Sequence, residues 1–259
     1  MLRDVGFVAA NTSRTRAYLS ALERHDLLPT WTLLLDDESP VAMPGQTSSR
    51  LSRPSSPDHQ TAEYWSEADF DPNAPLEPWL QRLSLAYEVA RARDINQASV
   101  VDLIVRSAPS VLIYSGYGGA LLRHDVLQTG KKFLHVHGGF LPDYKGSTTN
   151  YYSLLSDGKL GASAIFLTAE IDSGPVLSRR HFLPPAQRTE IDHIFDSAVR
   201  ARVLVDILSL YRDTGEWCFE LPKNQGGITY YIIHPVLKHL AILGNPATTK
   251  CSDNDCDHN

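Results

Sequence analysis

Residues 133–146 read FLHVHGGFLPDYKG, which joins an apolar strand pattern to two histidines and a glycine turn. Side chains two residues apart on a strand point to the same face, so His135 and His137 are expected side by side. Gly138 and Gly139 then end the strand. Either histidine alone would fit ordinary packing. Because ligands of open parallel sheets gather at the carboxyl ends of strands, the pair at that edge favours a site.

Apolar runs that alternate with amphipathic stretches surround this segment and predict one α/β domain. A strand, a helix and a second strand within residues 5–35 are typical of a parallel βαβ unit. The expected strands are 5–10, 31–35, 111–114, 133–137, 162–167, 176–182 and 228–233. The expected helices are 14–24, 79–93, 97–107, 120–128, 150–156, 190–212 and 236–243. Asn96 and Thr189 are expected to cap the helices that follow them.

Three further segments are distinguished by composition. Residues 36–95 form an insertion-rich part, much of it Ser, Pro, Asp and Glu without periodicity, and are expected to be largely irregular. Residues 186–247 are expected to form a small C-terminal appendage of helix and strand. Residues 248–259 are polar and terminal, which favours a disordered tail over a metal-binding tract built on Cys251, Cys256 and His258.

Charge and composition narrow the function classes. A net charge of −6 and a pI near 5.9 argue against bulk nucleic-acid binding through phosphate contacts. The apolar runs are too short to cross a bilayer, and the first residues do not read as a secretory signal. Three cysteines are too few for a disulfide framework, so a cytoplasmic location is expected.

Two other stretches belong with the histidines. Residues 170–175, EIDSGP, place Asp172 in a turn between two expected strands. An acidic residue before Gly-Pro often has no role beyond forming the turn. A carboxylate beside an imidazole, however, raises the pKa of the imidazole and orients the ring for proton transfer. The glycine-rich turn at 115–122 lacks the GxGxxG spacing of a dinucleotide site. Its glycines instead suit a flat ligand lying close to the backbone.

The histidine strand end, the LP-x-Y-x-G turn and the D-x-G-P turn together resemble the formyltransferase superfamily. This superfamily includes glycinamide ribonucleotide transformylase, methionyl-tRNA formyltransferase and the sugar N-formyltransferases. The resemblance implies a Rossmann-like catalytic domain over residues 1–185, with a mostly parallel sheet flanked by helices. It also implies 10-formyltetrahydrofolate as formyl donor, and no metal at the site.

The resemblance assigns roles residue by residue. His137 matches the catalytic histidine of the family and Asp172 its catalytic aspartate. His135 replaces an asparagine whose amide helps hold the developing oxyanion, so His135 is expected to donate that hydrogen bond instead. The expected folate contacts are Tyr117, Gly119, Leu121, Thr168, Glu170 and Ile171. The expected acceptor contacts are Ser147, Thr148 and Asn150, although this segment is equally consistent with a helix start packed on the sheet.

The expected function is N-formylation of a small amine, either an amino sugar or an amino-acid-like metabolite. Transfer RNA is disfavoured as acceptor because the C-terminal segment is not basic. A purine-pathway substrate is disfavoured because residues 9–13, AANTS, stand where the purine-pathway enzymes of this family have a phosphate-binding glycine motif. Three alternatives stay open. The first is diverged chemistry, either hydrolysis with water replacing the amine or, without folate, another acyl or carbamoyl transfer or a cyclisation. The second is a zinc or iron site on His135, His137 and Asp172, and the third is a non-catalytic binding module. The apolar stretch 228–233 also suggests a homodimer that covers it.

Overall fold

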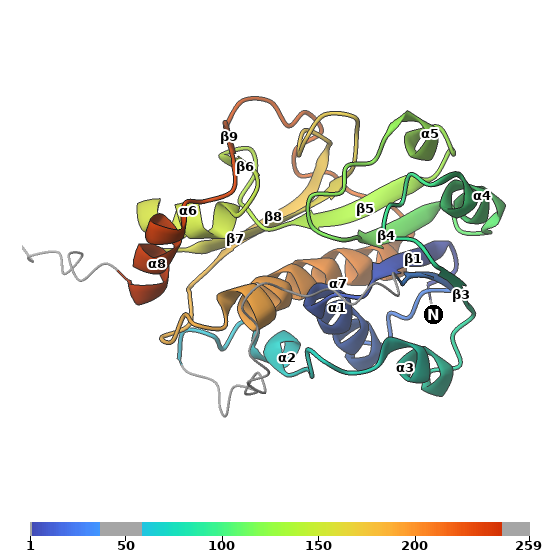
Figure 1. Ribbon diagram of the computed structural model, residues 1–259, viewed down its shortest axis with the longest axis horizontal. Helices are drawn as coiled ribbons and strands as arrows, with labels where there is room; N and C mark the ends of the chain where they lie inside the picture. Colours follow the sequence, from blue (N-terminus) through green and yellow to red (C-terminus); the bar gives the residue numbers. More distant parts are fainter. Residues whose placement is uncertain (1, 37–58, 245–259) are drawn as a thin grey trace, which may run out of the picture.

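The computed structural model describes residues 2–36 and 59–244. In this part of the chain a seven-stranded sheet runs in the order β3-β2-β1-β4-β5-β7-β8 (Figure 1). Strands β1 to β5 pair in parallel, and β7 and β8 add to one edge as antiparallel strands. The strands are β1 Val5–Ala10, β2 Trp31–Leu35, β3 Tyr87–Ala90, β4 Val111–Ser115, β5 Lys132–His137, β7 Leu160–Phe166 and β8 Val176–Phe182. The predicted mostly parallel α/β fold is confirmed.

Helices cover both faces of the sheet, as a parallel sheet requires. The helices of the described ranges are α1 Ser13–Arg24, α2 Trp65–Ala68, α3 Leu76–Arg82, α4 Ala98–Arg106, α5 His124–Leu127, α6 Thr149–Ser156, the π-helical turn η1 Ile191–Phe195, α7 Asp196–Thr214 and α8 Pro235–Leu243. Helices α1 and α7 share one hydrophobic core with alternate residues of β1, such as Phe7. Helix α4 packs in a second core with the residues between them, such as Val8.

Several local predictions between residues 79 and 128 are wrong. The helix expected over 79–93 ends at Arg82, Ser84 takes a φ of 54°, and β3 follows as an edge strand beside β2. Pairing with β2 therefore overrides the helical pattern. The helix expected over 120–128 is only the short α5. The predicted irregular segment 36–95 contains α2, α3 and β3 in its described part, while residues 37–58 lie outside the described residues.

The two predicted helix caps are also wrong. Asn96 does not cap α4, because its amide donates to the Asp94 carboxylate and to the Leu121 carbonyl. Thr189 does not cap the next helix either, since η1 begins at Ile191 after Glu190 and has no side-chain cap. In both places the preceding turn occupies the residue that the sequence pattern assigns to the cap.

The segment expected as an appendage divides into two parts. Helix α7 packs against α1 and β7 and belongs to the main core, so the predicted boundary at residue 185 does not separate packing units. Strand β9, Ile228–Tyr230, and α8 lie outside the sheet layers (Figure 1). Strand β9 pairs in parallel with β6, Tyr144–Gly146, a short strand that the sequence pattern did not indicate.

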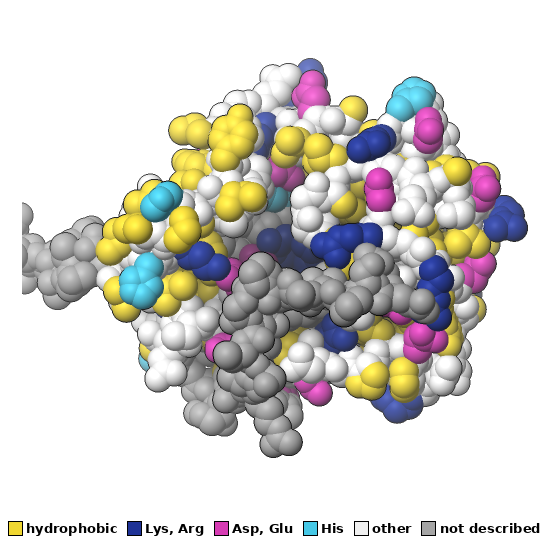
Figure 2. Space-filling model, in the orientation of Figure 1, with side chains coloured by type: hydrophobic (Ala, Val, Ile, Leu, Met, Phe, Trp, Pro, Cys, Tyr) yellow, Lys and Arg dark blue, Asp and Glu magenta, His cyan; other side chains and the backbone are white. Residues whose placement is uncertain are grey.

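The apolar surface of β9 and α8 is largely uncovered within the described chain. Tyr231 is 81% exposed and Ile232 80% in this single chain. Figure 2 shows hydrophobic side chains gathered over this end of the molecule. The tail 248–259 lies outside the described residues. No helix of the described ranges is long and apolar enough to cross a membrane.

Candidate functional site

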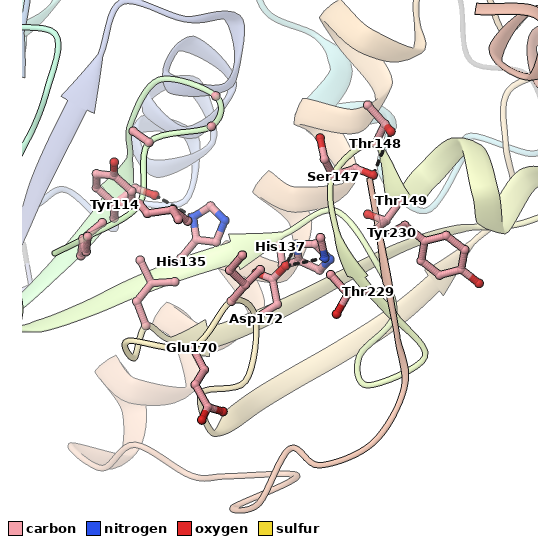
Figure 3. A pocket seen from close by; sticks show the side chains of 18 of the residues that line it. Tyr114, His135, His137, Ser147, Thr148, Thr149, Glu170, Asp172, Thr229 and Tyr230 are labelled. Atoms are coloured by element: carbon pink, nitrogen blue, oxygen red, sulfur yellow. Dashed lines mark hydrogen bonds and ion pairs between the residues drawn. The ribbon is translucent and has the colours of Figure 1, made fainter. Parts of the chain in front are cut away.

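A cavity of about 450 Å³ lies at the carboxyl ends of β4 and β5. Its walls come from segments far apart in the chain, namely 117–122, 146–149, 167–172 and 229–232, together with both histidines of β5. Figure 3 shows the His137 ring beside Asp172 and the His135 ring beside Tyr114. The structure thus brings together the three residues that the sequence singled out for catalysis.

His137 sits between two hydrogen-bond acceptors. Its Nε2 is 2.8 Å from the Tyr144 carbonyl oxygen, and its Nδ1 is 3.3 Å from Asp172 Oδ2. A neutral imidazole has one N–H and can donate to only one of them, so a second proton shared with Asp172 would satisfy both contacts. Burial lowers the pKa of His137, and the negative charge of Asp172 opposes that shift. The ring and the carboxylate are therefore placed to exchange a proton.

The Asp172 turn is held by its backbone and by a distant asparagine. Asp172 has a φ of 48°, a left-handed conformation that a non-glycine residue adopts only at a cost. Its Oδ2 accepts a hydrogen bond of 2.8 Å from the Gly146 N–H. The buried Asn224 amide donates to the carbonyls of Asp172, at 2.6 Å, and of Gly174, at 3.2 Å. Asn224 therefore fixes the turn that presents the carboxylate, and its loop sequence KNQGG gave no signal of this.

Replacing Asn224 with alanine should weaken both the fold and the site. Two buried carbonyls would lose their donor, which costs roughly 1–3 kcal/mol of unfolding free energy. The strained Asp172 turn would also lose its anchor, so activity should fall with stability. Urea denaturation measures the first effect. Asn73→Ala, at an exposed position, is the control and should stay within about 0.5 kcal/mol of wild type. Equal stability of the two variants would contradict the anchoring role.

His135 does not fit the predicted role of oxyanion donor. Its Nδ1 is 3.2 Å from the Tyr114 carbonyl oxygen, which can only accept, so Nδ1 carries the proton of the neutral ring. Nε2 is then an acceptor. Burial, followed by the positive charges of Arg14 and Arg200, lowers the pKa of His135 well below its ordinary value. The ring is therefore neutral near pH 7, and a second N–H for an oxyanion is absent.

Of the other predicted site residues, all but Asn150 line the cavity. Asn150 is buried, its amide donates to Asp196, and its carbonyl oxygen accepts from the Gly161 N–H at 2.8 Å. The packed helix start is therefore the correct interpretation there. The predicted residues that do line the cavity are Tyr117, Gly119, Leu121, Thr168, Glu170, Ile171, Ser147 and Thr148.

The cavity lining also includes residues outside the predicted site set, among them Arg14, Arg200, Thr229, Tyr230 and Tyr231. The last three reach the cavity only because β9 pairs with β6, and a contact between such distant segments leaves no local sequence signal. Arg14 is placed by the first turn of α1, where it donates to Ser115 Oγ at 3.2 Å. Its position just after the expected strand 5–10 was the one available clue.

The metal interpretation finds no support in the donor geometry. Across residues 2–36 and 59–244, no three His, Cys, Asp or Glu side chains are grouped to hold a metal ion. His135 Nδ1 and both nitrogens of His137 already face protein acceptors. Cys251, Cys256 and His258 lie outside the described residues.

A family model described as formyl transferase matches residues 52–190. The chain belongs to the formyl transferase family. The matched stretch contains His135, His137 and Asp172, together with the glycine-rich turn, so the family match and the cavity coincide. The resemblance drawn from the motifs is confirmed.

Curated formyl transferase relatives match over part of their length. A methionyl-tRNA formyltransferase of Finegoldia magna is 30% identical over 97 residues, which are 37% of this chain and 31% of that protein. The mitochondrial formyltetrahydrofolate deformylase 2 of Arabidopsis thaliana is 28% identical over 109 residues, 42% of this chain and 33% of that protein. The match therefore spans about a third of each relative.

Solved structures confirm the formyltransferase fold. A sugar N-formyltransferase from a Shewanella species superposes with a TM-score of 0.53 at 12% identity, covering 92% of this chain and 86% of that one. A phosphoribosylglycinamide formyltransferase from Anaplasma phagocytophilum gives a TM-score of 0.53 at 11% identity, covering 88% and 98%. At such identities the likeness shows the fold alone.

Proposed function

We propose that this cavity transfers a formyl group from 10-formyltetrahydrofolate to the amine of a small metabolite, an amino sugar or an amino-acid-like compound. The observation that carries the proposal is the buried His137–Asp172 pair at the end of β5, open to a cavity of about 450 Å³. That volume is in the range typical of small-molecule sites. The match to the formyl transferase family supports the reaction class.

The walls of the cavity suit a flat donor. A Cβ at Gly118 or Gly119 would meet no heavy atom within 4 Å, so the backbone there is open to a ring. Leu121 and Ile171 are 59% and 47% exposed and line the same cavity. Such apolar side chains beside bare backbone fit a pterin, which would be held between the 117–122 turn and the 168–171 loop. The bound donor supplies the formyl carbon.

The His137–Asp172 pair supplies the proton chemistry in this proposal. With its second proton in place, the pair can stabilise negative charge on the formyl oxygen as the amine attacks. It can then give that proton to the departing nitrogen. For this proton transfer, Asp172 is already oriented by the Gly146 N–H and by the Asn224 amide, which donates to the Asp172 carbonyl.

Hydrolysis is the second candidate, because curated relatives include formyltetrahydrofolate deformylases. In that reaction water replaces the amine at the same carbon and formate is released. The presence of the same histidine–aspartate pair is compatible with both reactions. The geometry of the site therefore does not distinguish transfer from hydrolysis, and the reaction product does.

The donor assignment is tested by calorimetric titration with a stable 10-formyltetrahydrofolate analogue, with and without a chelator. We expect micromolar affinity for the analogue both with and without the chelator. Absence of binding would contradict the folate proposal. Incubation with the donor and a panel of small amines follows, with mass spectrometry of the products. A new formamide supports transfer, whereas formate released at the same rate without any amine supports hydrolysis.

A further inference from the structure

We propose that His135 receives the acceptor substrate: its free Nε2 accepts a hydrogen bond from an N–H of a neutral amine and takes that proton as the N–C bond forms. This rests on the proposed formyl transfer. It reverses the donor role expected for the residue at this position. It also narrows the acceptor to amines that are uncharged near neutral pH.

The direction of the ring comes from β4. The Tyr114 carbonyl oxygen lies 3.2 Å from His135 Nδ1, and a backbone carbonyl offers no proton, so Nδ1 must donate. His135 lines the cavity, and Figure 3 shows its second ring nitrogen turned away from Tyr114. An asparagine at this position could present either its N–H or its oxygen to the cavity. The His135 ring, with its Nδ1 bound to the Tyr114 carbonyl, presents only the lone pair of Nε2.

The charges around this nitrogen favour a neutral partner. Arg14 and Arg200 line the same cavity, and both oppose a positive charge on the His135 ring. Arg200 is paired with Asp196 at 2.9 Å, whereas Arg14 contacts Ser115 and the Gly116 carbonyl, which carry no charge. The same positive field would repel an ammonium ion.

The remaining ionisable neighbours do not change this conclusion. The Tyr114 ring lies 6.1 Å from the His135 ring, and burial raises the pKa of Tyr114 to about 12, so it stays uncharged. The carboxylate of the neighbouring His137–Asp172 pair is already engaged by His137 and the Gly146 N–H. Glu170 lines the cavity but belongs to an exposed loop. A weakly basic amine, such as an aromatic amine, fits this environment better than an alkyl amine, which is protonated at neutral pH.

The proposed step conserves atoms and charge. The lone pair of the amine nitrogen forms the new bond to the formyl carbon, and the π electrons of the carbonyl move onto its oxygen. The N–H proton moves to His135 Nε2, which gives an imidazolium beside the new oxyanion. As the oxyanion re-forms the carbonyl, the bond to the original nitrogen breaks. That nitrogen receives the proton held by the His137–Asp172 pair, and the His135 imidazolium passes its proton to that pair, so both groups return to their starting forms.

The tautomer can be read directly by long-range ¹H–¹⁵N correlation spectroscopy of the ¹⁵N-labelled full chain, with the His135 signals identified by their loss in His135→Asn. The expected result at neutral pH is a protonated Nδ1 and a bare Nε2. A proton on Nε2, or on both nitrogens, would overturn the proposal. This measurement needs no substrate, so it is independent of whether formyl transfer is the reaction.

The pH profile of kcat/KM tests the catalytic part, with an aromatic amine and an alkyl amine of similar size as probes. Wild type should prefer the aromatic amine at neutral pH and lose activity as acid protonates His135. His135→Asn should fall by roughly 10²-fold or more and lose that acid limb. Activity that rises on acidification would instead show a donor histidine and overturn the proposal.

Arg14→Gln is the companion variant, because it removes one of the charges that oppose protonation of His135. The pKa of His135 should rise, so the acid limb of the profile should move to higher pH. A limb that stays in place would overturn the assignment to His135. If Nε2 is bare but no amine yields a formamide, the transfer step and the proposed function fail together, and only the tautomer stands.

Discussion

Replacing Asp172 with asparagine should lower kcat by roughly 10²- to 10⁴-fold, the range typical of a lost general acid–base group. Asparagine has nearly the same shape and can still accept from the Gly146 N–H, so the turn should persist. It cannot share the second proton with His137 Nδ1, which lies 3.3 Å from the carboxylate oxygen. The loss should therefore appear in turnover, with little change in unfolding free energy.

His137→Gln should produce a loss of the same order, and the double variant should be hardly slower than either single one. Groups that act as one unit are strongly non-additive in this way. Initial rates of formamide production and urea denaturation of each variant provide the measurements. Asp102→Asn, on the exposed side of α4, is the matched control and should change neither. Effects that simply multiply in the double variant would show that the two residues act separately.

Gly139→Ala is expected to damage stability and activity together. An added Cβ would lie 2.5 Å from the Tyr144 carbonyl oxygen and 2.7 Å from His137 Nε2, closer than real Cβ contacts allow. Relief of such overpacking usually costs about 1–3 kcal/mol. The displaced atoms are the two ends of the hydrogen bond that sets the His137 ring, so the Nδ1–Asp172 contact should be lost as well.

Thermal unfolding and single-turnover rates of Gly139→Ala measure the two effects. Gly118→Ala is the control for stability, because a Cβ there meets no heavy atom within 4 Å. It should leave the midpoint of unfolding close to wild type. A Gly139→Ala protein with wild-type stability and an unchanged rate would mean that the Tyr144 carbonyl does not orient His137.

Strong periodic patterns gave the main elements of the fold. Strands β1, β2 and β8 have the predicted limits, and β4 and β5 were placed to within one residue, because buried strands are continuous apolar runs. The predictions failed where pairing decided the structure. Residues 87–90 became an edge strand through hydrogen bonds to β2, and β6 exists only because β9 lies beside it.

For the site, the sequence by itself determined that His135 and His137 share one strand face, that glycines end that strand, and that an acidic turn follows between two strands. These are local properties of alternation and turn chemistry. Only the tertiary structure decided which nitrogen of His135 is free, because that depends on the Tyr114 carbonyl of a neighbouring strand. It likewise brought Asn224 to the Asp172 turn and Arg14 to the cavity wall. Such contacts join segments far apart in the chain, so no local pattern encodes them.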